Sequence, residues 1–135
     1  MYNRDEETWE ALTVAGREFL TECAADGKLT DYTTLNRELA ERTGLAGFDF
    51  HRPDERAALG HLLYRVVEST YPQARKMLSA VVVYGNSNDP GTGFYALATE
   101  MDLLPKGASA EQKLAFWSDQ LTGIFAHYGS RPASA

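Results

Sequence analysis

The sequence predicts a mostly helical α+β protein with one domain at residues 1–129 and a disordered tail at residues 130–135. Two observations carry this prediction. Apolar residues recur at three- and four-residue spacing along most of the chain, as they do on amphipathic helices. Only one run, residues 78–84, has the dense β-branched and apolar character of a strand. A chain of 135 residues suits one domain and is long enough to bury a core.

The first helix is expected at residues 5–25, where acidic side chains crowd the first turns and interact favourably with the helix dipole. Asp26-Gly27 ends this helix, and residues 28–30 follow as a candidate short strand. The helix carries one apolar stripe, made of Trp9, Leu12, Gly16, Phe19, Leu20 and Cys23. Such a stripe predicts that one face packs against a core.

A second helix is expected at residues 33–42, because Asp31 or Thr33 can serve as its N-cap. The loop after it contains two large apolar side chains, Phe48 and Phe50. Since aromatic side chains bury a large area, we expect both to close the edge of the core.

The third helix is expected at residues 53–69. It begins at Pro53, because proline suits the first helical turn, and Tyr71-Pro72 is expected to break the chain after it. Its buried stripe is made of Leu59, Leu62, Leu63, Val66 and Val67.

The strand expected at residues 78–84 leads into a polar, glycine-rich loop at residues 85–93, and a short helix is expected at residues 93–101. Ser109 and Gln112 have the spacing of a capping box, which predicts the start of the last helix. The buried stripe of that helix is expected to be Leu114, Trp117, Leu121, Ile124, Phe125 and Tyr128. The order of elements up to the loop is that of a winged helix, so we predict a winged-helix-like core with a small sheet and an added C-terminal helix.

Charge and composition limit the classes of function. The net charge of −6 argues against a protein that coats nucleic acid non-specifically, yet residues 51–76 carry five basic and three acidic side chains. No apolar run approaches the ~18 residues of a membrane span, and the acidic N-terminus lacks the pattern of a signal peptide. The single cysteine, Cys23, excludes an intramolecular disulfide framework. We therefore expect a cytoplasmic protein with no membrane partner.

Two resemblances extend this prediction. Residues 78–83, which read LSAVVV, and residues 90–98, which read PGTGFYALA, resemble a motif of uncharacterised bacterial proteins with a hydrophobic strand followed by a PGxGF-type turn. That resemblance covers about residues 30–100 and implies no settled activity. In addition, Tyr32-Thr33-Thr34-Leu35 and Arg56-Ala57-Ala58-Leu59-Gly60 are similar to the helix-turn-helix of the winged-helix part of DNA alkyltransferases.

In the alkyltransferase family the second helix of this pair contacts DNA, which implies the same for residues 53–69. The Pro-Cys-His-Arg nucleophile motif of that family is absent after this helix, and Cys23 lies far upstream. The resemblance therefore implies the scaffold and not alkyl transfer, because fold does not imply function.

The leading prediction is a binding module that contacts DNA or a DNA-bound partner through residues 53–69 and 85–93. The third helix would offer its polar edge to a major groove, as winged helices do, although the same pattern also fits an ordinary solvated face. The candidate contact residues are Arg56, His61, Arg65, Arg75, Lys76, Asn86, Asn88 and Thr92. We expect Arg56, Arg65 and the loop to act together.

Two other functions stay open. A protein–protein adaptor, a homodimer or a subunit of an assembly would suit the net acidity, and Phe116, which lies off the last stripe, would be its exposed anchor. A small enzyme would need a pocket formed by the 85–93 loop near Asp49, His51 or His61.

We predict no catalytic residue, metal or cofactor. A cysteine on an apolar stripe is typically an inert, buried thiol, as expected for Cys23. The three histidines, His51, His61 and His127, lack the spacing of metal ligands. The 85–93 loop lacks the lysine of a phosphate-binding loop and does not match a dinucleotide fingerprint.

Overall fold

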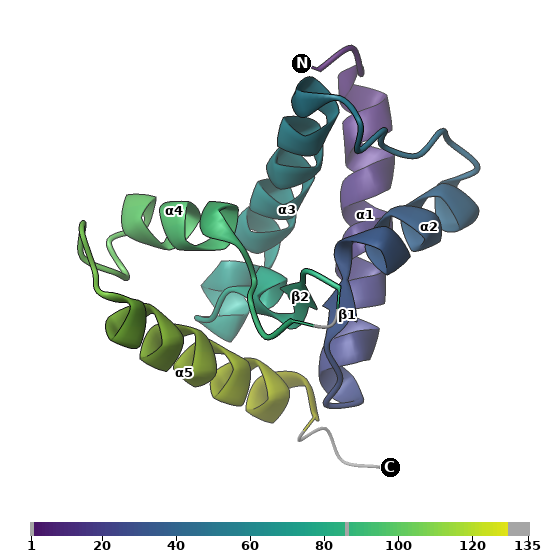
Figure 1. Ribbon diagram of the computed structural model, residues 1–135. Helices are drawn as coiled ribbons and strands as arrows, with labels where there is room; N and C mark the ends of the chain where they lie inside the picture. The colour runs from purple at the N-terminus through teal and green to yellow at the C-terminus, as the bar shows by residue number, and fades with distance from the viewer. Residues whose placement is uncertain (1, 86, 130–135) are drawn as a thin grey trace.

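The computed structural model describes residues 2–85 and 87–129, and within them the chain is mostly helical with one small sheet (Figure 1). This confirms the predicted mostly helical α+β class. In chain order the elements are α1 (Glu6–Ala25), β1 (Thr30–Asp31), α2 (Tyr32–Thr43), α3 (Pro53–Ala74), the 3-10 helix η1 (Leu78–Val81), β2 (Val82–Val83), α4 (Thr92–Glu100) and α5 (Ala110–Gly129). The predicted contact Asn86 and the predicted tail at residues 130–135 lie outside the described residues.

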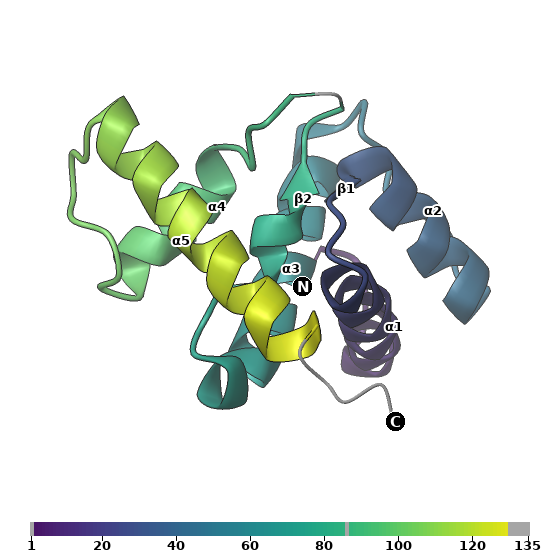
Figure 2. The ribbon, with the colours of Figure 1, turned by 90° about the horizontal axis from the view of Figure 1, so that it is seen from below.

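The helices form two groups on either side of the strands. α1 and α3 run side by side, and α1 also packs against α2 and α5. Seen from below, β1 and β2 lie between α2 on one side and the pair α4 and α5 on the other (Figure 2). This arrangement leaves an angle between α3 and α4, on the side of α4 that faces away from α5.

Side chains cap the starts of α1, α2 and α5. The Asp5 carboxylate accepts from the Thr8 N–H at 2.8 Å, and the Asp31 carboxylate accepts from the Thr34 N–H at 2.7 Å. Ser109 and Gln112 form the predicted capping box, because each side chain accepts from the other's backbone N–H. The predicted capping box of α5 is therefore confirmed, and Asp31, one of the two predicted candidates, is the N-cap of α2. The N-cap of α1 is Asp5, and no cap was predicted for this helix.

The predicted break at Tyr71-Pro72 is wrong, because α3 continues through Pro72 to Ala74. Proline at this position removes only the hydrogen bond to the carbonyl of Glu68, and Glu68 is exposed, so water can replace the lost donor. The added turn buries Thr70 and Ala74. The helix ends at Arg75, which adopts a left-handed conformation with φ 57°.

The predicted strand at residues 78–84 is mostly a 3-10 turn. Only Val82 and Val83 are extended, and they pair in parallel with Thr30 and Asp31 of β1, two positions later than the start of the strand expected at 28–30. All residues from 78 to 83 are buried, and a buried apolar run cannot be assigned to strand or helix from composition alone. After β2 the described chain enters α4 instead of returning as a second wing strand.

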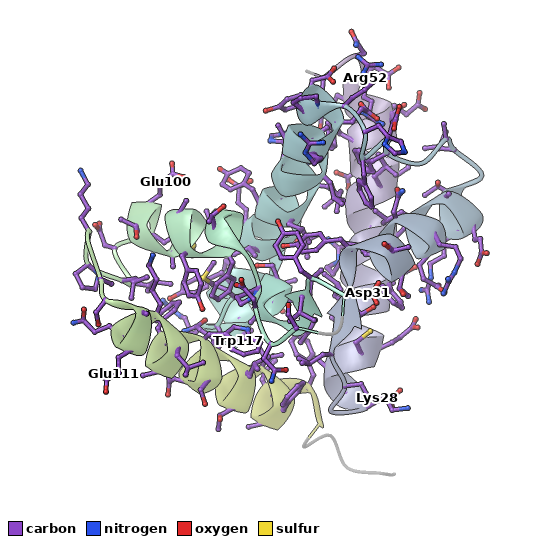
Figure 3. All side chains as sticks on the ribbon, in the orientation of Figure 1. Lys28, Asp31, Arg52, Glu100, Glu111 and Trp117 are labelled. Carbon is purple, nitrogen blue, oxygen red and sulfur yellow. The ribbon has the colours of Figure 1, made fainter. Side chains whose placement is uncertain are left out.

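The apolar side chains form two clusters that meet at Leu121. One lies among α1, α2, α3 and η1. The other lies between α4 and α5, where the Trp117 indole N–H donates to the Ala80 carbonyl at 2.8 Å (Figure 3).

The first turns of α5 bury a different side chain from the one predicted. Leu114 is 57% exposed, whereas Phe116 is half-buried with its ring 5.9 Å from that of Phe94, because α4 packs along this side of α5. The expectation that Phe116 is an exposed anchor is therefore wrong.

Candidate functional site

α3 and α4 meet at an angle (Figure 1), and a groove of about 860 Å³ lies between them. One wall is the face of α3 that carries Arg56, Ala57, Gly60 and Tyr64. The facing wall is α4, and the first two residues of α2, Tyr32 and Thr33, also line the groove. The predicted contact helix and the Gly85 and Gly93 ends of the predicted contact loop thus border one and the same hollow.

Small residues on both walls keep the groove open. On α3 these are Ala57 and Gly60, and on α4 they are Gly93 and Ala96. A Cβ atom added at Gly60 or at Gly93 would meet nothing within 4 Å. Beneath these walls the buried side chains Leu59, Leu63, Ser79 and Phe94 form the floor.

Aromatic rings line the end of the groove near α2. The Tyr32 and Tyr84 rings lie 4.6 Å apart at 33°, and the Tyr32 hydroxyl donates to the Pro90 carbonyl at 2.7 Å. Burial raises the pKa of Tyr32 above its usual range, so this hydroxyl keeps its proton. Tyr84 is 53% exposed and lies against Gly91, where a Cβ atom would overlap its ring. The two rings therefore hold Tyr84, Pro90 and Gly91 against the start of α2.

The rim carries charges of both signs on opposite walls. Arg56 donates to the Phe50 carbonyl at 2.6 Å, and Glu100 projects from α4 away from α5 (Figure 3). Near Glu100, the Tyr64 hydroxyl donates to the Glu68 carboxylate at 3.1 Å, and this hydrogen bond raises the pKa of Tyr64. The groove is thus apolar on its floor and polar at its edges, which is typical of ligand sites.

Two sets of donors on the groove have no protein partner among the described residues. The Ser79 hydroxyl is one; the Ser79 residue is only 5% exposed. The others are the first N–H groups of α4, because its N-cap is Gly91 and no side chain caps the helix. Both sets can donate to a molecule that lies in the groove.

The predicted contact residues are distributed over three parts of the molecule. Arg56 and Thr92 line the groove, whereas Asn88 is exposed in the loop beside it. His61 and Arg65 lie on the opposite flank of α3, because nine residues of helix turn the chain by about 900° and so place Arg65 about 180° from Arg56. The expectation that Arg56 and Arg65 act on one face is therefore wrong.

On that flank the charges are already engaged. Arg65 donates to Glu6 at 2.7 Å and lies 3.5 Å from Glu10, and its side chain is only 17% exposed. The His61 ring packs edge-on against Trp9 at 4.8 Å. These two residues hold α1 to α3.

Arg75 and Lys76 lie at the far end of α3, about 28 Å from Arg56 along the helix axis. The Lys76 ammonium group is 3.3 Å from the Asp119 carboxylate, and its methylene groups lie over Gly123 of α5. Lys76 therefore helps to dock α5 and is remote from the groove.

The three residues that the enzyme hypothesis needs near the 85–93 loop lie outside the groove. Asp49, His51 and His61 are not among the residues that line the groove. Burial raises the pKa of Cys23 to about 11, so its thiol is protonated and inert near neutral pH. In residues 2–85 and 87–129, no three histidine, cysteine or carboxylate side chains gather as they would to hold a metal ion.

The sequence did not point to Tyr32, Ser79 or Tyr84 as site residues. Tyr84 directly follows the apolar run, and a large aromatic residue at that position could have indicated a contact residue. Ser79 interrupts the same run and is its only hydroxyl-bearing residue before Tyr84. A hydroxyl inside a buried apolar run is the pattern that identifies such a residue.

A scan against family models, a search of the curated proteins and a search of the solved structures found no match to this chain. Among the described residues, no helix has the length and apolar character needed to cross a membrane. The groove and its lining residues are therefore the features that bear on function.

Proposed function

We propose that this chain is a non-catalytic binding module that contacts DNA through α3, and that its groove holds one nucleobase that has left the base stack. One observation carries the proposal. The helix and the loop that the sequence predicts to contact DNA border a single groove lined by aromatic side chains.

The size and the lining of the groove suit a single base. Its volume of about 860 Å³ falls in the range of roughly 300–1,000 Å³ that is usual for small-molecule sites. Stacking of a base on an aromatic side chain contributes about 1–3 kcal/mol. A base inside a duplex cannot reach such a site, so it has to be extruded at a cost of a few kcal/mol.

The charge of the protein limits how the DNA backbone is held. With a net charge of −6, the protein as a whole repels phosphates. Arg56 at the rim supplies one cation, and the positive end of the α4 dipole adds to it. We therefore expect modest affinity that depends more on the base in the groove than on phosphate contacts.

The winged-helix relationship is part of the same proposal. Its support is the order of α1, β1, α2 and α3 followed by a short strand, with α2 and α3 as the helix-turn-helix pair. In this interpretation α4 takes the place of the second wing strand and forms the outer wall of the groove.

Fluorescence anisotropy at low salt tests the proposal with two duplexes, one fully matched and one with a single unpaired base. We expect the unpaired base to improve affinity by at least about tenfold, because less base pairing is lost on extrusion. Gly60→Leu should remove this preference by filling the groove. Ala126→Leu adds the same bulk at an exposed position of α5 and serves as the control.

Equal affinity for the two duplexes, or full binding by Gly60→Leu, would exclude base capture. No binding of either duplex at tens of micromolar would exclude DNA as the ligand and would favour the protein–protein adaptor. The anchor first expected for such an adaptor, Phe116, packs on Phe94 and is half-buried instead of exposed.

A further inference from the structure

We propose that the inner end of the groove selects a base that carries a keto oxygen over one that carries an amino group at the same position, with Ser79 as a specificity-determining residue. This inference rests on the function proposed above. It follows from the donors that the floor and the start of α4 present to the groove.

The Ser79 hydroxyl is an exception among the buried hydroxyl groups. Thr13 and Thr70 are similarly buried, and each donates to a carbonyl of its own helix, at 2.7 and 2.9 Å. The Ser79 hydroxyl has no such partner within the described part of the chain, although Ser79 is only 5% exposed and lines the groove. In residues 2–85 and 87–129 no fully buried side-chain oxygen or nitrogen lacks a partner, so the Ser79 hydroxyl is open to the groove, where a ligand can bond to it.

The start of α4 presents further donors. α1 and α2 are capped by Asp5 and Asp31, whose carboxylates accept from the first turn. At α4, the Asp89 carboxylate accepts from the Gly91 N–H at 2.9 Å, one residue before the helix, and no side chain caps the helix itself. The N–H groups of Thr92 and Gly93, both groove residues, remain for a ligand.

These donors determine the chemistry of the ligand edge. A hydroxyl can donate or accept, but backbone N–H groups only donate, and the helix dipole adds positive charge. An acceptor on the ligand is therefore favoured because it can bond to the hydroxyl and to the backbone N–H groups, whereas an amino group would leave the N–H groups of Thr92 and Gly93 without an acceptor. Guanine and thymine carry a keto oxygen where adenine and cytosine carry an amino group.

Two pairs of bases isolate this difference. Hypoxanthine carries a keto oxygen where adenine carries an amino group, with an N–H at the adjacent ring nitrogen, and uracil differs from cytosine in the same way. Each base is placed as the single unpaired base of otherwise identical duplexes, and affinity is measured by anisotropy with the full chain. We expect the keto member of each pair to bind about three- to tenfold more tightly, the effect of one net hydrogen bond.

The variant Ser79→Ala tests the assignment of the residue. It removes a hydroxyl that has no partner among residues 2–85 and 87–129, so the fold should be retained, which thermal unfolding can confirm. We expect the keto preference to fall by at least half on a logarithmic scale, with unchanged affinity for the adenine and cytosine duplexes. Ser118→Ala, at an exposed position of α5, should leave the preference intact.

The outcomes separate this inference from the function on which it rests. If the protein does not prefer an unpaired base over a matched duplex, the proposed function fails. If that preference is present but keto and amino bases bind equally, or if Ser79→Ala keeps the full keto preference, only the inference on selectivity is overturned.

Discussion

The two flanks of α3 use their polar groups differently. On the flank that faces α1, Arg65 is paired with Glu6 and Glu10, and His61 packs against Trp9. On the flank that faces α4, the residues are small or aromatic, and Arg56 bonds only to the Phe50 carbonyl among the described residues. The first flank holds α1 against α3, whereas the side chains of the second flank face the groove and can contact a ligand. Substitutions on the two flanks should therefore affect different measurements.

The largest effect is expected where the N-terminal segment meets α3. Arg4 forms a two-pronged ion pair with Glu55, both side chains are 13% exposed, and the guanidinium lies 4.2 Å from the Phe48 ring. Arg4→Met would leave the Glu55 charge without this partner, so we expect the free energy of unfolding to fall by about 3–5 kcal/mol. Urea denaturation measures this. A loss below about 1 kcal/mol would mean that the ion pair is not structural.

The same pair predicts a weaker, pH-dependent effect. The hydrogen bond from Arg4 lowers the pKa of Glu55 below its usual value of 4.5. A carboxyl whose pKa is lower in the folded state contributes stability above its unfolded pKa, and this contribution is lost as the pH falls through the folded value. Unfolding free energy should therefore drop below pH 4.5, and Glu55→Gln should flatten this drop. Identical pH profiles for the two proteins would contradict the prediction.

On the groove flank, Gly60→Leu should change binding and spare the fold. A Cβ atom at Gly60 meets nothing within 4 Å, and replacing glycine inside a helix gains up to about 1 kcal/mol of helix propensity. We expect thermal stability to stay equal or rise, while the affinity for a duplex with an unpaired base falls at least about tenfold. A clear loss of stability would show that the groove is packed in solution, and the comparison of the two flanks would fail.

The sequence predicts the helices well, because their stripes and caps are local signals. Asp31, Ser109 and Gln112 illustrate this, since each contacts residues within four positions. The errors arise where a distant partner decides the conformation. Burial from several helices makes residues 78–81 a 3-10 turn, and packing against α4 reverses the exposure expected of Leu114 and Phe116.

The groove could not be predicted for the same reason. Its walls come from α2, α3 and α4, and the sequence does not show which flank of α3 meets α1. Arg56 and Arg65 therefore looked equivalent, as two cations on a polar edge. Only the ion pairs with Glu6 and Glu10 separate a structural arginine from one at a site.

The smallest expected effect compares these two arginines directly. Arg65→Ala removes a mostly buried cation of α3 that pairs with Glu6 of α1. We therefore expect the free energy of unfolding to fall by about 0.5–1 kcal/mol and the affinity for DNA to stay unchanged. Arg56→Ala should leave stability unchanged and lower the affinity for DNA only a few-fold.

The salt dependence of binding separates the two arginines further. If Arg56 is the one cation that contacts phosphate, a plot of log affinity against log salt concentration should have a slope of about −1 in the wild type and near zero in Arg56→Ala. Arg65→Ala should keep the slope of the wild type. A slope that changes in Arg65→Ala and not in Arg56→Ala would reverse the assignment of the two flanks, because counterion release reports which arginine meets the phosphate.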